Sequence, residues 1–107
     1  MNAKRKGSQG ERELAALLQS RGLEARRNDQ RYVGGLHNPD IALTMGGHDV
    51  HVEVKRVERL NIQEAMNQAI RDADGQAMPV VAHRRNRGPW LVTMRLEDAL
   101  GVWGYGQ

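Results

Sequence analysis

The chain has no cysteine and no phenylalanine, and aromatic residues make up only 4% of its 107 positions. The absence of cysteine excludes a disulfide framework and a thiolate metal site, and it fits a reducing cytoplasm. Without phenylalanine, the core must be filled by Leu, Val, Ile, Ala and Met. No apolar run is long enough for a membrane span or a signal peptide. We therefore expect one cytoplasmic domain over residues 1–107 with a small aliphatic core.

The excess of positive charge is small, with a formal net charge of +3 and an isoelectric point near 9.8. This bias is compatible with a polyanionic partner but does not establish one. Most of the positive charges lie in the first third of the chain or between residues 84 and 87. The residues concerned are Lys4, Arg5, Lys6, Arg12, Arg26, Arg27, Arg31, Arg84, Arg85 and Arg87. Residues 1–7 are expected to form a mobile basic arm, either a solvated tail or a strip that lies along a phosphate backbone.

The most informative stretch lies in the middle of the chain, from residue 38 to residue 57. Its second half alternates valine with His51, Glu53 and Lys55, which is the period of a half-buried strand. A glycine pair at residues 46–47 predicts a turn that joins this strand to a shorter one before it. The stretch therefore predicts a hairpin.

Asp40 stands at the start of the first of these strands, directly after Pro39. If the two strands pair, Asp40 comes beside Glu53, and Lys55 shares the face of Glu53 at roughly 7 Å along the strand. Carboxylates are ligands for Mg²⁺, and a bound divalent ion can activate a water and stabilise charge on a phosphodiester. A lysine can orient that water. The alternative is a surface strand with an ordinary Glu–Lys pair.

Two motifs resemble a known family. Pro39-Asp40 followed by Glu53-Val54-Lys55 resembles the PD-(D/E)XK nuclease signature, and residues 6–14 resemble the first helix of archaeal-type and phage-encoded Holliday junction resolvases. The resemblance extends more weakly over residues 6–93. It implies an α/β, restriction-endonuclease-like fold, in which a mixed central sheet is flanked by helices in the order α-β-β-β-α-β-β.

The resemblance also implies a site. Glu11, Asp40, Glu53 and the carbonyl of Val54 would bind Mg²⁺, for which Mn²⁺ can substitute, and Lys55 would orient the attacking water. The product would be a DNA strand with a 5′-phosphate. Resolving a four-way junction needs two matched cuts, so a homodimer is expected. The expected partner is DNA, and no association with a membrane is expected.

Glu11 has two interpretations. Residues 8–21 read as a helix, and Ser8-x-x-Glu11 fits a capping box, in which Glu11 would only close the helix end. Glu11 is also in line with the apolar stripe that contains Leu14 and Leu18, so it points toward the sheet. The resemblance favours the metal site.

Residues 23–31 predict the first strand, and residues 32–38 predict a glycine-bearing loop. Arg27 falls near a position where the resembled resolvases keep a basic residue that contacts DNA. In those resolvases the loop often carries a serine that assists cleavage, but this loop has neither serine nor threonine. Tyr32, His37 or Asn38 would have to substitute, or the contribution is missing, which puts junction specificity in question more than nuclease chemistry.

The second half of the chain predicts a helix over residues 61–73, which Asn61 caps and Gly75 ends. PD-(D/E)XK proteins often place a glutamine on this helix to support the metal site. Gln68 is the better candidate and Gln63 the other, while a solvated helix surface is the plain alternative.

Residues 78–82 and 90–94 predict two strands around an arginine-rich turn, followed by a short helix over 95–100 and a glycine and aromatic tail over 101–107. The turn with Trp90 at its exit suits phosphate contact and stacking, and a solvated turn is the alternative. Trp103 is either loose or docked on a second subunit. The DNA-binding candidates are Lys4, Arg5, Lys6, Arg12, Arg27, Arg84, Arg85 and Arg87.

The histidines do not predict a zinc site. His48 and His51 straddle a turn and a strand, so their rings would need an unusual bulge to meet on one ion. His51 shares the face of Glu53 and Lys55, which places it at the substrate edge.

Three functions compete: a junction-resolving homodimer, a PD-(D/E)XK nuclease with another DNA target such as a flap, nick or duplex, and a non-catalytic DNA-binding module of the same fold. The third is disfavoured because all four site positions carry competent side chains.

Overall fold

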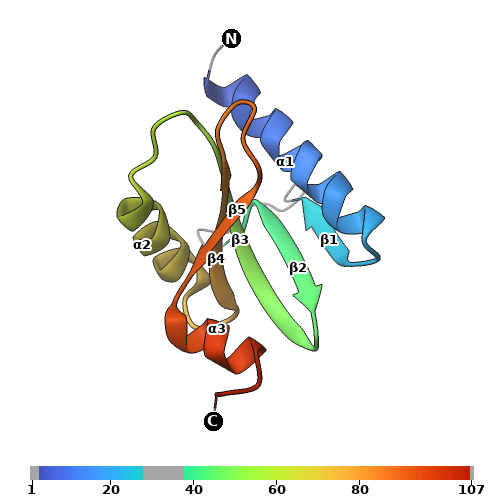
Figure 1. Cartoon of the computed structure of the whole chain (residues 1–107), viewed down its shortest axis with the longest axis vertical. Coiled ribbons are helices and arrows are strands. Elements are labelled where there is room, and N and C mark those ends of the chain that lie inside the picture. Colours follow the sequence, from blue (N-terminus) through green and yellow to red (C-terminus); the bar gives the residue numbers. More distant parts are fainter. Residues whose placement is uncertain (1–2, 28–37, 107) are drawn as a thin grey trace.

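The computed structural model describes residues 3–27 and 38–106, with side chains from residue 8 onward. Figure 1 shows a five-stranded sheet with helices against it. The elements are α1 (Ala3–Ser20), β1 (Glu24–Arg27), β2 (Ile41–Met45), β3 (His48–Arg56), α2 (Ile62–Ala73), β4 (Met78–Arg84), β5 (Leu91–Met94) and α3 (Leu96–Val102). None of the described helices is long and apolar enough to cross a membrane.

The sheet has the strand order β1-β2-β3-β4-β5. The first three strands form an antiparallel meander, β4 is parallel to β3 after the α2 crossover, and β5 returns antiparallel to β4. This is the predicted mixed sheet in the predicted order of elements. The hairpin turn at Gly46 and Gly47 has φ angles of 58° and 81°, a conformation that favours glycine.

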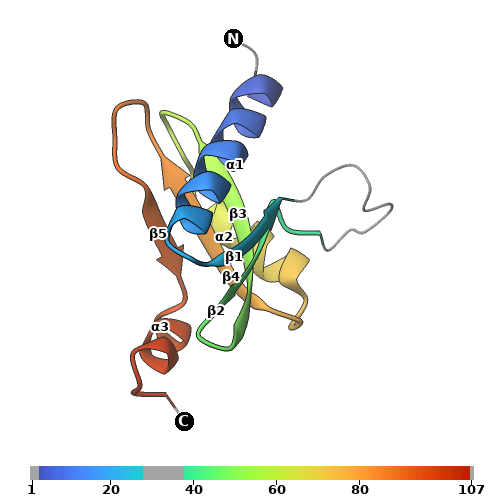
Figure 2. The same cartoon turned by 90° about the vertical axis from the view of Figure 1, so that its right-hand side faces the viewer.

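Two layers of helix cover the two faces of the sheet (Figures 1 and 2). Alternation along β3 sends Val50, Val52 and Val54 into one core, which includes residues of α1, β1 and β2. The opposite face of β3 and β4 meets α2, where Ala65, Met66, Ala69 and Val81 form a second core cluster. The polar residues of β3 therefore face α2.

The α2 helix begins and ends as predicted. Asn61 caps it by accepting a hydrogen bond from the backbone N–H of Glu64 at 3.1 Å. Its last turn closes at Asp74 and Gly75, both with positive φ.

Several predicted boundaries were wrong. Helix α1 begins at Ala3, so residues 3–7 are helical and do not form an unstructured arm, and Ser8 lies inside the helix where it cannot cap it. Ala, Lys and Arg are good helix formers, so the run 3–6 continues the helix past the glycine at position 7. Strand β4 continues two residues beyond the predicted end, and α3 reaches Val102, which shortens the tail. The predicted loop residues Tyr32 and His37 lie outside the described residues.

Helix α1 approaches β3 closely at Gly10. A Cβ at this position would stand 3.1 Å from the Cβ of Arg56 and 3.6 Å from Cγ1 of Val54. The absence of a side chain at Gly10 thus lets the next residue, Glu11, come down to the edge of the sheet.

Candidate active site of the central hairpin

Asp40 is held at the start of β2 by a backbone contact with β3. Its Oδ2 accepts a hydrogen bond from the N–H of Val54 at 2.8 Å. The last paired residues at this end of the two strands are Ile41 and Val52, so Asp40 and Glu53, the next residue on each strand, lie side by side. Burial is the largest of the causes that raise the pKa of Asp40 to about 7; the nearby carboxylates of Glu53 and Glu11 contribute in the same direction, and the Val54 N–H opposes them.

Glu53 lies on the α2 face of β3 and is only 4% exposed. Its Oε1 is 2.9 Å from Nε2 of His51, which is buried on the same strand face. A carboxylate so far from water needs a compensating charge or several hydrogen bonds. Glu53 is thus a buried carboxylate flanked by Asp40 on one side and by His51 on the other.

Glu11 reaches the same edge from α1. Its carboxylate is 3.5 Å from Nη2 of Arg27 on β1. Burial raises the pKa of Glu11, Arg27 opposes that shift, and Glu53 adds to it. The structure therefore brings the carboxylates of Glu11, Asp40 and Glu53 into one electrostatic cluster.

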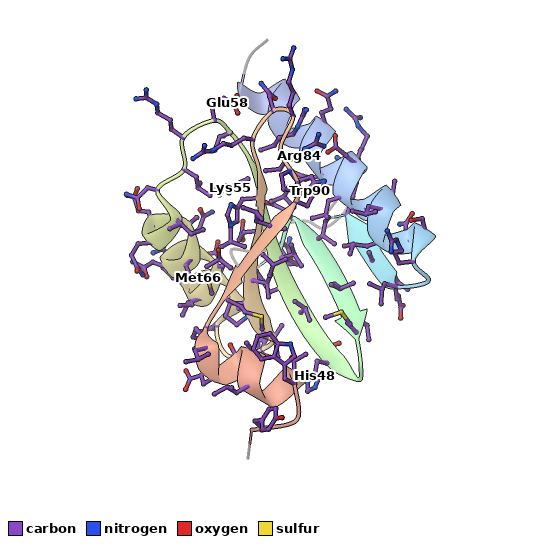
Figure 3. The ribbon with its side chains drawn as sticks, viewed as in Figure 1. His48, Lys55, Glu58, Met66, Arg84 and Trp90 are labelled. Atoms are coloured by element: carbon purple, nitrogen blue, oxygen red, sulfur yellow. The ribbon has the colours of Figure 1, made fainter. Side chains whose placement is uncertain are left out.

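Lys55 extends from β3 toward α2 (Figure 3). Its Nζ donates a hydrogen bond to Oε1 of Gln68 at 3.2 Å. Both side chains line a hollow of about 370 Å³ that also contains Arg59 and Arg71. Gln63 instead bonds Asn67 on the exposed side of the helix, so Gln68 is the glutamine that meets Lys55.

The donors at this edge suit a hard divalent cation. Carboxylate oxygens and a backbone carbonyl are the groups that Mg²⁺ and Mn²⁺ accept. The pKa values of Glu11 and Asp40 are raised by burial and by neighbouring carboxylates, so a bound cation would stabilise the charged forms of both groups. Glu11, Asp40, Glu53 and the Val54 carbonyl are the residues that would hold it.

Comparison with known proteins identifies the family. The model of the family described as "Phage putative PDDEXK endonuclease" matches residues 2–103. The chain belongs to this family. Among solved structures, it is similar to Hjc, a Holliday junction resolvase from the archaeal hyperthermophile Archaeoglobus fulgidus, with 28% identity and a TM-score of 0.64. The match covers 82% of this chain and 76% of that one. Comparison with curated protein sequences gave no match.

This PDDEXK family member thus has the restriction-endonuclease-like fold that the sequence predicted, and its class of activity is that of a nuclease. The motif positions Asp40, Glu53 and Lys55 lie at one end of the paired strands β2 and β3. The family motif and the carboxylate cluster therefore coincide in space.

Two of the predicted DNA-binding arginines already have partners within the PDDEXK domain. Arg27 pairs with Glu11, and Arg84 pairs with Glu13 while donating from Nε to the Gly88 carbonyl at 2.8 Å. By contrast, Arg12, Arg85 and Arg87 are exposed. Among the predicted DNA-binding residues whose side chains the structure describes, these three arginines are therefore the most accessible to DNA.

Trp90 does not lie open for stacking as predicted. Its ring packs against the core cluster, and its Nε1 donates to Oε1 of Glu13 at 3.1 Å. Figure 3 shows Trp90 close to Arg84. Both residues contact Glu13 and so connect the β4–β5 hairpin to α1. Their role in the structure is therefore to stabilise the fold.

Sequence reasoning missed Asp72. Its carboxylate, the His51 ring and the Glu53 carboxylate have ligand atoms within 4.8 Å of one another. The spacing contained an indication, because Asp72 follows Gln68 by four residues and so lies on the same side of α2. His51 itself is buried, not at an open substrate edge as expected.

The raised pKa of Asp40 predicts how the metal-free PDDEXK domain responds to pH. Between the usual aspartate pKa of 3.8 and about 7, the folded protein holds a proton that the unfolded chain has released. The free energy of unfolding should therefore fall as the pH rises through this window, by at most about 1.4 kcal/mol per pH unit. Urea unfolding in EDTA from pH 4 to pH 8 measures this slope.

Asp40→Asn should flatten that slope, because the amide still accepts the Val54 hydrogen bond but does not titrate. The exposed Asp49 on β3 provides the matched control, and Asp49→Asn should keep the wild-type slope. Equal slopes in wild type and Asp40→Asn would show that Asp40 is not the buried proton acceptor.

Proposed function

We propose that this protein is a Mg²⁺-dependent, structure-specific DNA endonuclease that resolves four-way junctions by paired hydrolysis of phosphodiesters as a homodimer. The observation that carries the proposal is the convergence of Glu11, Asp40 and Glu53 beside Lys55. The similarity to a Holliday junction resolvase supports the choice of DNA substrate.

The residues divide the reaction between them. Glu11, Asp40, Glu53 and the Val54 carbonyl would hold the ion, which when bound supplies an activated water and neutralises charge on the phosphate. Lys55, held by Gln68, orients the water toward the phosphorus and compensates the charge that develops there. The water oxygen bonds to phosphorus while the bond from phosphorus to the 3′ oxygen breaks, which leaves a 3′-hydroxyl and a 5′-phosphate.

Arg27 is suited to position the DNA at this site. Among the described residues its buried Nε has no hydrogen-bond acceptor, although its Nη2 pairs with Glu11. A phosphate oxygen would satisfy that donor. The exposed Arg12, Arg85 and Arg87 add contacts to the backbone, and Lys4, Arg5 and Lys6 lie in the turns of α1 that project past the sheet (Figures 1 and 2).

Exposed apolar residues support a dimer. Strand β5 is an edge strand of the sheet, and with α3 it displays Leu91, Val92, Leu96 and Trp103, each more than half exposed. A surface of this kind on a small protein marks an interface. Sedimentation equilibrium should give a particle of twice the 12.0 kDa chain mass.

Cleavage of a synthetic four-way junction, a linear duplex and a flap, with Mg²⁺ or with EDTA, tests the function. Symmetric paired nicks confined to the junction are expected. Equal cutting of all three substrates would contradict junction resolution and favour a nuclease with another DNA target. Binding without cutting by the wild type, in Mg²⁺ and in Mn²⁺, would favour a non-catalytic DNA-binding module.

Gln68→Leu tests the positioning of Lys55. It removes the acceptor that holds the lysine ammonium, so the single-turnover cleavage rate should fall by about 10-fold with little change in DNA affinity. Gln63→Leu makes the same change on the exposed side of the same helix and should leave the rate unchanged. Equal rates for the two variants would remove Gln68 from the proposed machinery.

A further inference from the structure

The α2 face of β3 carries a second group of potential metal ligands beside the carboxylate cluster. His51 and Glu53 are 3% and 4% exposed, and Asp72 completes the group from α2. The three ligand atoms lie within 4.8 Å of one another, and His51 Nε2 is 2.9 Å from Glu53 Oε1.

The fold explains why these side chains meet. Residues 51, 53 and 55 share one face of β3, and alanines on α2 let the helix approach that face closely. Gln68 and Asp72 are one turn apart on α2. Gln68 contacts Lys55, and Asp72 lies near His51 and Glu53.

The charges of this group are not balanced. Asp72 is partly buried, and among the described residues no hydrogen bond or ion pair engages its carboxylate. Glu53 has the His51 ring and the Asp40 carboxyl as side-chain hydrogen-bond partners, so one of its two partners is itself acidic. Two carboxylates shielded from water in this way are costly unless a positive charge is present.

We propose that His51, Glu53 and Asp72 form a second divalent-cation site, which shares Glu53 with the site assigned above. Metal–ligand bonds of about 2.0–2.2 Å set the ligand atoms of one ion roughly 3 Å apart. The His51–Glu53 separation already fits, and a side-chain rotation of Asp72 closes the rest. The sharing of Glu53 makes this inference rest on the proposed function.

The imidazole determines which ions suit the second site. Mg²⁺ and Ca²⁺ prefer oxygen donors alone, whereas Mn²⁺, Co²⁺ and Zn²⁺ accept nitrogen as well. The first site offers oxygen only and the second offers one nitrogen and two carboxylates. The two sites therefore differ in the ion that they select.

The competing explanation is a structural triad, in which a protonated His51 bridges the two carboxylates and no metal binds. Titration of the whole chain with Mn²⁺, followed by electron paramagnetic resonance, separates the two. The free-ion signal counts the bound ions, and electron spin-echo modulation detects a nitrogen ligand. The wild type should bind two Mn²⁺ per chain and show nitrogen modulation.

Matched variants assign the signal. Asp72→Asn should bind one Mn²⁺ fewer, whereas Asp74→Asn, which removes a charge two residues along, should still bind two. His51→Gln should lose the nitrogen modulation, whereas His48→Gln, at the exposed start of β3, should keep it. Asp40→Asn should lose only the ion without nitrogen.

A wild type that binds one Mn²⁺ with no nitrogen modulation, and loses it in Asp40→Asn, would overturn the second site and leave the proposed nuclease site intact. A wild type that binds no Mn²⁺ would overturn both. Since the nitrogen modulation is measured on the wild type, the first of these results does not depend on whether His51→Gln or Asp72→Asn folds.

Discussion

Glu53→Gln is expected to lower the rate of Mg²⁺-dependent cleavage by roughly 10³-fold while DNA binding persists. Glu53 lies between Asp40 and His51, so its carboxylate would contribute to both proposed ions. Losing a charged metal ligand weakens the ion and the stabilisation of the transition state together. The rate is measured under single-turnover conditions on the four-way junction, and affinity by fluorescence anisotropy in Ca²⁺.

Glu24→Gln is the matched control, because it removes the same charge from an exposed position on β1. It should cleave at the wild-type rate. Glutamine keeps a hydrogen-bonding group next to His51, so Glu53→Gln should fold and should be at least as stable as the wild type without metal. A Glu53→Gln variant that cleaves as fast as Glu24→Gln would remove Glu53 from the site.

Lys55→Ala is the second variant with a large expected effect, a loss of about 10²–10³-fold in the cleavage rate at saturating Mg²⁺. The lysine ammonium is the cation on β3 that faces the same side as Glu53, and Gln68 holds it there. Its loss leaves the carboxylates able to bind the ion but removes the group that orients the water. The Mn²⁺ affinity should therefore stay within about twofold of the wild-type value, because no metal ligand changes.

Arg59→Ala separates this effect from the general loss of positive charge. Arg59 lines the same hollow as Lys55 and is exposed. Both variants should weaken DNA binding slightly and make its salt dependence slightly shallower, since each removes one positive charge. Only Lys55→Ala should lose the cleavage rate at saturating DNA, and equal rates for the two variants would contradict a catalytic Lys55.

The sequence was sufficient to predict the central hairpin and its neighbours. Strict alternation along residues 50–55, a glycine turn at 46–47 and a capped helix from Asn61 are local features, and local features determine local structure. The mixed sheet and its order of elements were also predicted, and in the structure the α2 crossover sets β4 parallel to β3. That the polar positions of β3 face α2 is seen only in the structure.

Contacts between distant segments were not predictable in the same way. Arg84 and Trp90 both bind Glu13, which is more than 70 residues away in the chain. A motif of arginines and a tryptophan in a turn is typical of phosphate contact. Here, however, Arg84 and Trp90 contact Glu13 on α1. Their role depends on a partner that only the folded chain brings near.

The burial of the carboxylates and the distances between them could likewise not be predicted from the sequence. The pKa of Asp40 depends on its burial and on its distance from Glu11 and Glu53, which no spacing in the chain specifies. Asp72 looked like an ordinary helix residue until α2 was packed on β3. The identities of the candidate site residues were therefore easier to predict than the electrostatic environment that determines their reactivity.

Anomalous X-ray scattering from a crystal soaked in Mn²⁺ tests the central claim most directly. It should show an ion bonded to the carboxylates of Asp40 and Glu53 and to the Val54 carbonyl, with Glu11 at the same site and Lys55 within reach of a bound water. A crystal at saturating Mn²⁺ with no ion between Asp40 and Glu53, or with their carboxylates bound to ions elsewhere, would contradict the account.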